Sequence, residues 1–503
     1  MPSEAEHEDA MLGRWWMPGK NEFLLGDLLI NGKNIRLKVS SAKEKTHIWD
    51  RRRSSYHNVI FGELIDGSSV TLTECYEYSR TQTGSGFTQY ELYCEKAIFG
   101  LHCTDIEHTI CNSVSIEIPN LDIWLGEKHY QSAFSDGDDE YNDFSVPDSP
   151  SKKYYIAYNL YEKYWSDNID EYQFKFSSLA FSNFLAKDFS LVSRYSVEIS
   201  SKTGAQFSDL MQEVQLCVWL FSLLYGKYIE PSSIDVSIIS KERNTTARVM
   251  PPFRKESINR SASEMALNMK DCRENISYYI KKSREVFKEY NEVCSITIFR
   301  KRSQQDDNID SVRGRFLDII HAIEGISLKS EDSNIIQKSE FKKFKTRVLG
   351  IIDEMKFAAE NSETKENSSM AENIETFREK VNSNISHLNE RKLEGKISGF
   401  FSLFLVRTLS CLNLSSSDIP RIVKTRNYYA HMSNKKQKGL LDIGEMASLN
   451  QRLITLINIF FMKQIGIEEV DAVYGLRGTY EHRDRIDIDE FNSPAHIQKQ
   501  EIL

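Results

Sequence analysis

Apolar and polar residues in the first half of the chain follow the short patterns of β-strands. Residues 23–39 hold two apolar runs on either side of Asn31-Gly32, and residues 57–76 repeat this arrangement around Asp66-Gly67. Asn-Gly and Asp-Gly favour the tight turns of β-hairpins. Further strand patterns occupy residues 114–120, 172–178 and 193–200. The pattern therefore predicts a β-rich N-terminal half.

A helical pattern closes this half and continues through the second. In residues 209–229 apolar side chains recur at three- and four-residue steps, as on one face of a helix, and Pro231 ends the pattern. Residues 241–264 mix Pro, Ser and charged residues, which is typical of a domain boundary. Further helices are predicted at residues 263–290, 313–330, 342–360, 375–392, 396–414, 419–432 and 445–465, with an exposed loop at 362–373.

These patterns predict an α+β protein with two domains, a β-rich domain in residues 1–245 and an all-α helical bundle in residues 246–503. A chain of 503 residues with 40% apolar content is long enough to form two cores. Its net charge of −9 is unfavourable for general nucleic-acid binding. Any contact with nucleic acid must therefore come from a local basic patch.

The remaining composition favours a cytoplasmic protein. The eight cysteines are dispersed without a Cys-x-x-Cys pair, which indicates reduced thiols. The acidic, polar first residues do not have the pattern of a signal peptide. The apolar run 399–414 is too short to cross a bilayer and contains Arg407, so we expect no membrane segment.

A basic stretch near the C-terminus contains the candidate catalytic residues. Ser416, Ser417 and Asp418 can cap a helix that Pro420 enters in its first turn. The motif follows in KTRNYYAHMSNKK, residues 424–436. At about 100° per residue, the side chains at positions 426, 427 and 431 bracket one sector of such a helix. A phosphate fits over the small residue at position 430, between these side chains.

Arg426, Asn427 and His431 are residue types that suit metal-free RNA cleavage. Histidine titrates near neutrality, so it can take or give the protons of the 2′-hydroxyl and the leaving 5′-oxygen. The guanidinium stabilises the charge that gathers on phosphorus, and asparagine can fix a phosphate oxygen or orient the histidine. Residues 421–438 hold six Lys or Arg and no carboxylate, and Lys424, Lys435 and Lys436 are the candidate RNA-binding residues.

Spacing alone does not identify this site. The same separation of arginine and histidine occurs in Arg52/His57 and Arg477/His482, and Arg315/His321 differs by one residue. The asparagine after Arg426, the helical setting and the absence of carboxylates in the local sequence distinguish the stretch. A solvated basic helix face remains the alternative that the residues by themselves leave open.

Three segments resemble a known family. RNYYAH, residues 426–431, resembles the Arg-x4–6-His signature of HEPN domains, and FLDIIHAIEGIS, residues 316–327, resembles an early helix of that fold. LGRWWMPGKNEFLLGDLLINGKNIRLKV, residues 12–39, resembles the start of the N-terminal domain of ApeA-type anti-phage HEPN proteins. The resemblance touches both halves of the chain in the expected order.

The resemblance implies a function that composition does not show. Such proteins are similar to metal-independent endoribonucleases that form homodimers or higher homo-oligomers, with two motifs facing one cleft. Many act as toxins in abortive infection, cutting cellular RNA, with tRNA as the expected substrate, when a phage-derived trigger is sensed. The N-terminal domain would be the sensing or regulatory half. Arg426 and His431 take the catalytic positions, and Asn427 takes the polar position beside the arginine.

Two further residues are supporting candidates. Glu324 lies at the edge of an apolar stripe that includes Phe316 and Ile320, so its carboxylate needs a partner. That partner can be Arg426 near the cleft, or another cation in an ion pair unconnected with chemistry. Tyr429 lies on the same predicted helix as Arg426. We expect no cofactor and no catalytic metal.

Two other functions stay open. HEPN folds can lose catalysis and serve as modules that bind RNA, nucleotides or partners. Alternatively, the N-terminal half is the working part, as a zinc-stabilised ligand sensor. Cysteine and histidine crowd one stretch there without the spacing of a zinc knuckle, and buried thiols are the simpler interpretation. These residues are Cys94, His102, Cys103, His108 and Cys111.

Overall fold

The computed structural model describes residues 9–31, 34–42, 56–82, 87–126, 130–135, 153–158, 161–185, 188–239, 245–250, 264–294, 309–329, 335–360, 365–385, 389, 391–430 and 438–493. The chain divides into two compact units, Met1–Arg284 and Glu285–Leu503, which are described separately. The boundary expected after residue 245 stays a prediction. None of the described helices is long and apolar enough to cross a membrane.

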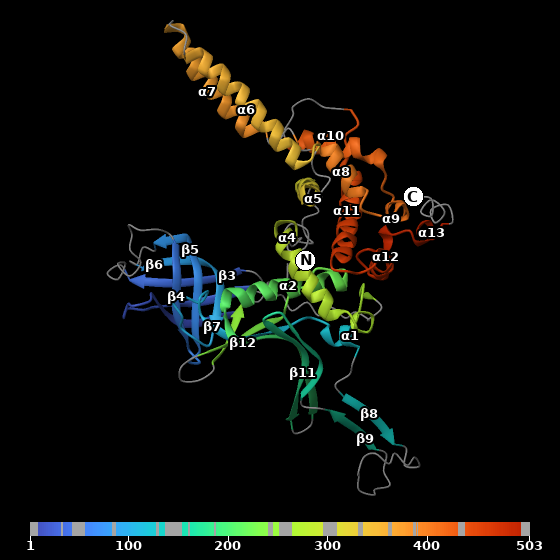
Figure 1. Ribbon diagram of the computed structural model, residues 1–503. Helices are drawn as coiled ribbons and strands as arrows, with labels where there is room; N and C mark the ends of the chain where they lie inside the picture. The colour runs from blue at the N-terminus through green and yellow to red at the C-terminus, as the bar shows by residue number, and fades with distance from the viewer. Residues whose placement is uncertain are drawn as a thin grey trace. The chain divides into compact units, whose positions relative to one another are not determined.

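The first unit is built on antiparallel strands, as the alternating pattern predicts (Figure 1). The strands of its main sheet are β1 (Asp9–Trp16), β2 (Leu24–Asn31), β3 (Asn34–Ala42), β4 (Tyr56–Leu64), β5 (Ser69–Gln82), β6 (Phe87–Phe99), β7 (Ile110–Glu117), β10 (Tyr161–Ile169), β11 (Tyr172–Leu185), β12 (Asp188–Gln206), β13 (Ser233–Ile238) and β14 (Thr245–Met250). Strands β8 (Tyr130–Ser135) and β9 (Lys153–Tyr158) pair with each other.

Part of the main sheet closes into a barrel. The order β6-β3-β2-β1-β4-β5 returns to its start because β5 also pairs with β6. The predicted hairpin turn at Asp66-Gly67 is confirmed: Asp66 Oδ1 accepts a hydrogen bond of 2.8 Å from the Ser68 N–H, and Gly67 has φ 85°. Trp15 lies in the barrel core with 0% exposure, and its indole donates to the Gly26 carbonyl. Closure leaves no free edge in this part of the sheet.

The other strands of this sheet carry a helix on one face. Helix α2 (Phe207–Tyr225) packs against β7 and β12 through many buried apolar residues. It was predicted at residues 209–229, but it ends earlier because Gly226 takes a left-handed conformation, φ 65°, that stops the helix before Pro231. The short helices α1 (Leu121–Leu125) and α3 (Met269–Cys272) complete the described helices that lie wholly in this unit.

The second unit is helical, as predicted. Its elements are α5 (Ile309–Lys329), α6 (Lys338–Glu360), α7 (Lys365–Ile385), α8 (Leu393–Phe401), α9 (Val406–Cys411), η6 (Ser416–Asp418), α10 (Ile419–Ala430), α11 (Ile443–Gln464), α12 (Glu469–Gly478), η7 (Arg483–Arg485) and α13 (Ile488–Phe491). Helix α4 (Ile276–Cys294) spans the division between the units. Helix α5 packs against α8, α10 and α11 around a core that includes Phe316, Ile320 and Leu456.

Two predicted helix boundaries in this unit were wrong. The helix expected at residues 396–414 is divided into α8 and α9, since the chain turns at residues 402–405. The loop expected at residues 362–373 is helical from Lys365 onward. Pairing with α6 stabilises this polar helix through ion pairs, such as Arg378 with Asp353 at 2.5 Å. Polarity alone does not distinguish a loop from a helix held by its neighbour.

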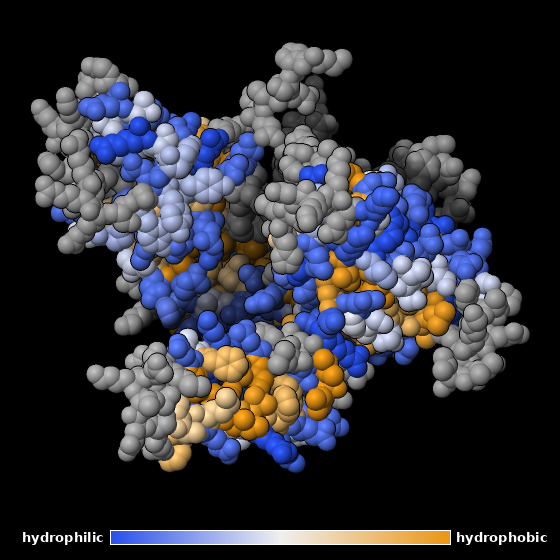
Figure 2. All heavy atoms as spheres, turned by 90° about the horizontal axis from the view of Figure 1, so that it is seen from above, coloured by the Kyte–Doolittle hydropathy of each residue, from blue (hydrophilic) through white to orange (hydrophobic). Residues whose placement is uncertain are grey.

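The visible surface is mostly hydrophilic, with patches of apolar residues between the charged ones (Figure 2). Several large apolar side chains are indeed exposed in both units, including Phe181, Val192, Phe344, Ile351 and Met355. Isolated exposed apolar residues are ordinary, whereas rows of them on one element mark interaction surfaces.

Candidate active site

Helix α10 begins where the capping residues predict. The Ser415 N–H donates to Asp418 Oδ2 at 2.8 Å, so the carboxylate closes the short turn η6 ahead of the helix. Pro420 occupies the first turn, where it lacks an N–H that would have no partner in any case. The helix starts at Ile419, as predicted, and its last described residue is Ala430.

The rotation of α10 is set by its buried side. Ile419, Ile422 and Thr425 are buried at three-residue steps, and α10 packs against α5 and α8. The Thr425 hydroxyl accepts a hydrogen bond of 3.0 Å from the Leu441 N–H, which ties α10 to the segment that leads into α11. With this face fixed, the next residue, Arg426, comes to the edge of the packed surface.

Arg426 is held by a carboxylate from a distant part of the chain. Its Nη2 donates to Glu324 Oε1 at 3.1 Å, and its Nη1 reaches Asn427 Oδ1 at 3.4 Å. The side chains of Arg426 and Glu324 are 22% and 18% exposed. A half-buried guanidinium with a charged partner has a restricted orientation, yet its remaining N–H groups stay available to a ligand.

Helix α5 presents Glu324 because of its apolar stripe. Phe316, Ile319, Ile320 and Ile323 are fully or almost fully buried. Glu324 follows the last of these residues, so it lies at the rim of the stripe with its carboxylate toward α10. The sequence singled out this glutamate as needing a cation, and the fold supplies Arg426. The catalytic relevance of the pair stays a prediction.

Tyr429 also contacts α5. The guanidinium carbon of Arg313 lies 5.0 Å from the centre of the Tyr429 ring, within the range of a cation–π interaction. The Tyr428 ring packs edge-on against Tyr429, with 5.1 Å between centroids. The first of these contacts places an arginine of α5 beside α10.

The other predicted residues of the site are placed only in part. The Lys424 ammonium donates to the Lys438 carbonyl, which ties α10 to the chain beyond the motif. His431, Lys435 and Lys436 lie outside the described residues. In sequence, His431 directly follows Ala430, the last described residue of α10. The structure therefore brings together Arg426, Asn427 and Glu324, and it leaves the position of the imidazole a prediction.

The histidines of the other Arg–His pairs lie in different environments. His482 is 3% exposed, and its Nδ1 lies 2.8 Å from the Thr455 hydroxyl, so it is part of the core of the second unit. Burial lowers the pKa of His57 in the barrel. Arg52, which precedes it by five residues, lies outside the described residues. His321 is exposed on α5. Burial thus separates candidates that spacing does not.

The crowded cysteines and histidines of the first unit do not converge. His102 Nε2 lies 2.8 Å from the Gly62 carbonyl, and the Cys103 thiol lies 3.2 Å from the Thr109 hydroxyl. His108 pairs with Asp105, and burial raises the pKa of the Cys111 thiol to about 11. Within the described ranges, no group of three or more His, Cys, Asp or Glu side chains is placed to hold a metal ion.

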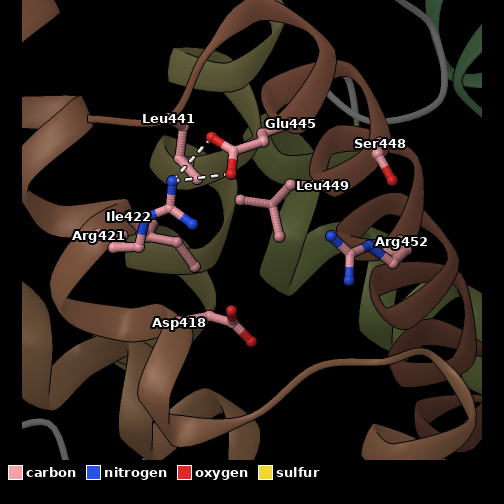
Figure 3. A pocket seen from close by; sticks show the side chains of 8 residues that line it. All are labelled: Asp418, Arg421, Ile422, Leu441, Glu445, Ser448, Leu449 and Arg452. Atoms are coloured by element: carbon pink, nitrogen blue, oxygen red, sulfur yellow. Dashed lines mark hydrogen bonds and ion pairs between the residues drawn. The ribbon is translucent and has the colours of Figure 1, made fainter. Parts of the chain in front are cut away.

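A pocket of about 210 Å³ lies on another side of α10 (Figure 3). Arg421 is about 140° around the helix from Arg426 at 100° per residue, and it reaches across this pocket to Glu445 at 2.7 Å. The lining side chains come from η6, α10, α11 and the segment between the two α-helices: Asp418, Arg421, Ile422, Leu441, Glu445, Ser448, Leu449 and Arg452.

The pocket changes the interpretation of the basic patch. Glu445 is the third residue of α11 and closes its capping box with Asp442. The hydrogen bond from Arg421 lowers the pKa of the Glu445 carboxyl, which stays ionised and offsets the arginine charge. Arg421 is thus less available to RNA than the sequence indicated. The Asp-x-x-Glu spacing ahead of an apolar helix predicts the cap, but nothing local predicts the pairing with Arg421.

Two family models match the chain. ApeA N-terminal domain 1 matches residues 10–282, and Apea-like HEPN matches residues 317–471. The first covers more than half of the chain, and the second contains both Glu324 and Arg426. The matches overlap all three segments on which the family resemblance rests, and they confirm it. No curated protein and no solved structure was found to match.

Proposed function

Since the chain belongs to the ApeA-type HEPN proteins, which are anti-phage proteins of the nuclease type, we propose that it is a metal-independent endoribonuclease acting in abortive infection. It cleaves cellular RNA, with tRNA as the first candidate, and leaves 2′,3′-cyclic phosphate and 5′-hydroxyl ends. HEPN domains are generally ribonucleases. The observation that carries the proposal is the Arg426 guanidinium, which Glu324 holds at 3.1 Å beside Asn427.

Arg426 stabilises the transition state. One of its nitrogens, Nη2, is engaged by Glu324, and the side chain is still 22% exposed. The other N–H groups can therefore reach the non-bridging oxygens of a phosphate. Charge grows on these oxygens as the 2′-oxygen attacks phosphorus, so a positively charged donor binds the transition state more tightly than the substrate. Glu324 is a positioning residue that fixes the direction of the guanidinium.

His431 transfers the protons. The 2′-hydroxyl loses a proton as its oxygen bonds to phosphorus, and the 5′-oxygen gains one as its bond to phosphorus breaks. An imidazole titrates near neutral pH, so it can serve as base in one step or as acid in the other. Asn427 orients the histidine or a phosphate oxygen through its amide. Lys424, Lys435 and Lys436 attract the backbone of the RNA.

The two regions divide the work. The β-rich region senses a phage-derived trigger or restrains the nuclease, and the helical region cuts RNA in the cytoplasm as a toxin. Two copies of the chain bring two motifs to one cleft, as HEPN nucleases commonly do. This division follows the two family matches, which cover the barrel-containing region and the helical bundle separately.

Chelation tests the chemistry. We expect that the purified protein cleaves RNA at the same rate with and without an excess of EDTA, because the proposed acid, base and charge-stabilising groups are all side chains. The measurement is gel-resolved cleavage of labelled RNA, with mass spectrometry of the ends. A divalent-dependent nuclease in the same buffer is the control. Loss of cleavage on chelation, or products with 5′-phosphates, would show that the proposed mechanism is wrong.

Changing Glu324 tests its positioning role. Glu324→Ala is expected to lower kcat by about 10- to 100-fold with little change in KM, since a misdirected guanidinium loses transition-state contacts rather than affinity for RNA. Glu324→Gln retains an acceptor for Arg426 and should recover much of this loss. Cleavage kinetics and thermal melting are measured together.

The matched control for Glu324 is Glu445→Ala, which removes the carboxylate that pairs with another arginine of the same helix, Arg421. It is expected to leave kcat unchanged. If both glutamate variants lower Tm equally and neither alters kcat, the Glu324 pair is only structural.

A further inference from the structure

Helices α6 and α7 form an antiparallel pair within the second unit (Figure 1). One face of α6 packs on α7, where Ile352 and Ala359 are 6% and 9% exposed. Lys356 reaches Glu375 of α7 at 2.8 Å from the same side. This face accounts for the pairing of the two helices.

A second apolar row runs along α6 beside the face that packs on α7, and its residues nearest to that face, Phe341 and Val348, are half-buried. It consists of residues spaced alternately by three and four positions: Phe341, Phe344, Val348, Ile351, Met355 and Ala358. Phe344, Ile351 and Met355 are 48%, 50% and 55% exposed. Alternating steps of three and four are the a and d positions of a coiled coil, which pack against a partner helix. We call these six residues the α6 seam.

The seam matches itself when it is reversed. In an antiparallel pair of identical helices, an a residue of one copy faces a d residue of the other. The facing pairs are Phe341 with Ala358, Phe344 with Met355, and Val348 with Ile351. A large side chain meets a smaller one or a flexible one in the outer layers, which suits close packing. A two-fold interface uses the same surface on both subunits, so this self-complementarity is what a second copy requires.

Charges beside the seam favour the same orientation. Arg347 and Glu354 occupy equivalent flanking positions, one heptad apart, and both are exposed. Neither Arg347 nor Glu354 forms an ion pair with another of the described residues. Antiparallel pairing about the middle of the seam brings Arg347 of each copy to Glu354 of the other. Parallel pairing would place Arg347 opposite the apolar Ile352 and align like charges, because α6 is mainly basic before residue 348 and mainly acidic after residue 352.

We propose that the α6 seam is a self-association surface, on which α6 of a second copy of this chain packs in antiparallel orientation. The proposal does not depend on catalysis by α10. It concerns residues other than Arg426, Asn427 and Glu324, and it assigns a role to exposed apolar residues that the nuclease chemistry leaves unused. The interface joins two hairpins, and α7 of each copy lies beside the paired α6 helices.

Analytical ultracentrifugation of the full chain over a range of concentrations tests the proposal. The wild type is expected to dimerise, and Ile351→Asp to raise the dissociation constant by at least about 100-fold, because the interface then buries a carboxylate from each copy. Phe357→Asp is the matched control: it makes the same kind of change on an exposed residue of α6 outside the seam, 68% exposed, and should dimerise like the wild type.

A charge exchange tests the orientation. Arg347→Glu and Glu354→Arg are each expected to weaken the dimer several-fold, and the double variant to return to the wild-type dissociation constant. Circular dichroism verifies that each variant is folded. A monomeric wild type, or an Ile351→Asp variant that associates as tightly as the wild type, overturns the proposal. Failure of the double variant to recover excludes the antiparallel arrangement. If Ile351→Asp loses RNA binding but sediments with the same mass as the wild type, the seam binds RNA instead of a second copy.

Discussion

Arg426→Ala is expected to reduce RNA cleavage by about 1,000-fold, the scale found when one donor to a developing oxyanion is removed. Glu324 holds the guanidinium beside Asn427, and its planar, forked N–H groups match the oxygens of a phosphate. Alanine leaves the growing charge on phosphate without that donor. Sequencing of RNA ends after expression of the wild type and the variant, side by side, measures the effect in cells, and single-turnover cleavage measures it in solution.

The matched control for this experiment is Arg421→Ala. Arg421 is on the same helix and also pairs with a carboxylate, Glu445, at 2.7 Å. The substitution removes the same charge from α10, but the Arg421 side chain lines the pocket of Figure 3. We expect it to retain cleavage within about threefold, since a distant charge acts mainly through screened attraction of RNA. If the two variants lose activity equally, Arg426 acts through general basicity and not at the scissile phosphate.

His431→Ala is expected to lower cleavage by about 100- to 10,000-fold, the usual contribution of a general acid or base. Wild-type activity should also show an ionisation near the ordinary histidine pKa of about 6.5, and that limb of the pH profile should vanish in the variant. Cleavage rates between pH 5 and 9 provide the measurement. His321→Ala, a change of an exposed histidine on α5, should leave both rate and profile intact.

The same variant separates an enzyme from a binding module. A HEPN domain that acts by binding RNA or a partner would keep its protective effect against phage after His431→Ala, provided that the protein folds and accumulates normally. Loss of protection together with loss of new RNA ends supports the nuclease. Full protection without new ends would establish the binding function and end the catalytic proposal.

Local patterns predicted seven of the fourteen described strands of the first unit and the longer helices of the second. The hairpin at Asp66-Gly67 and the start of α10 at Ile419 depend on turn and capping residues within a few positions, so they can be inferred from short windows. Errors arose where neighbours decide the outcome. Helix α7 is longer than its polarity indicated because α6 supports it. The six apolar residues of the α6 seam were not singled out, since a buried and an exposed helix face have the same spacing.

Local sequence patterns also could not predict that the barrel closes. Alternation predicts that a segment is a strand, but the pairing of β5 with β6 as well as with β4 depends on register between whole strands. In the same way, the spacing of Arg and His made three candidate pairs equivalent, and a fourth differed by only one residue. Burial of His482 in the core of the second unit removed one of them, and this burial is a property of packed helices rather than of spacing.

The sequence by itself determined that Arg426 and Asn427 lie on a capped helix in a locally basic stretch, because caps and helical rotation act over a few residues. Only the tertiary structure decided which carboxylates meet the arginines of that helix: Glu324, from 102 residues earlier in the chain, holds Arg426, and Glu445 neutralises Arg421. Both pairings arise from the packing of α10 against α5 and beside α11. Hydrophobic burial sets that packing, and distance along the chain places no limit on it.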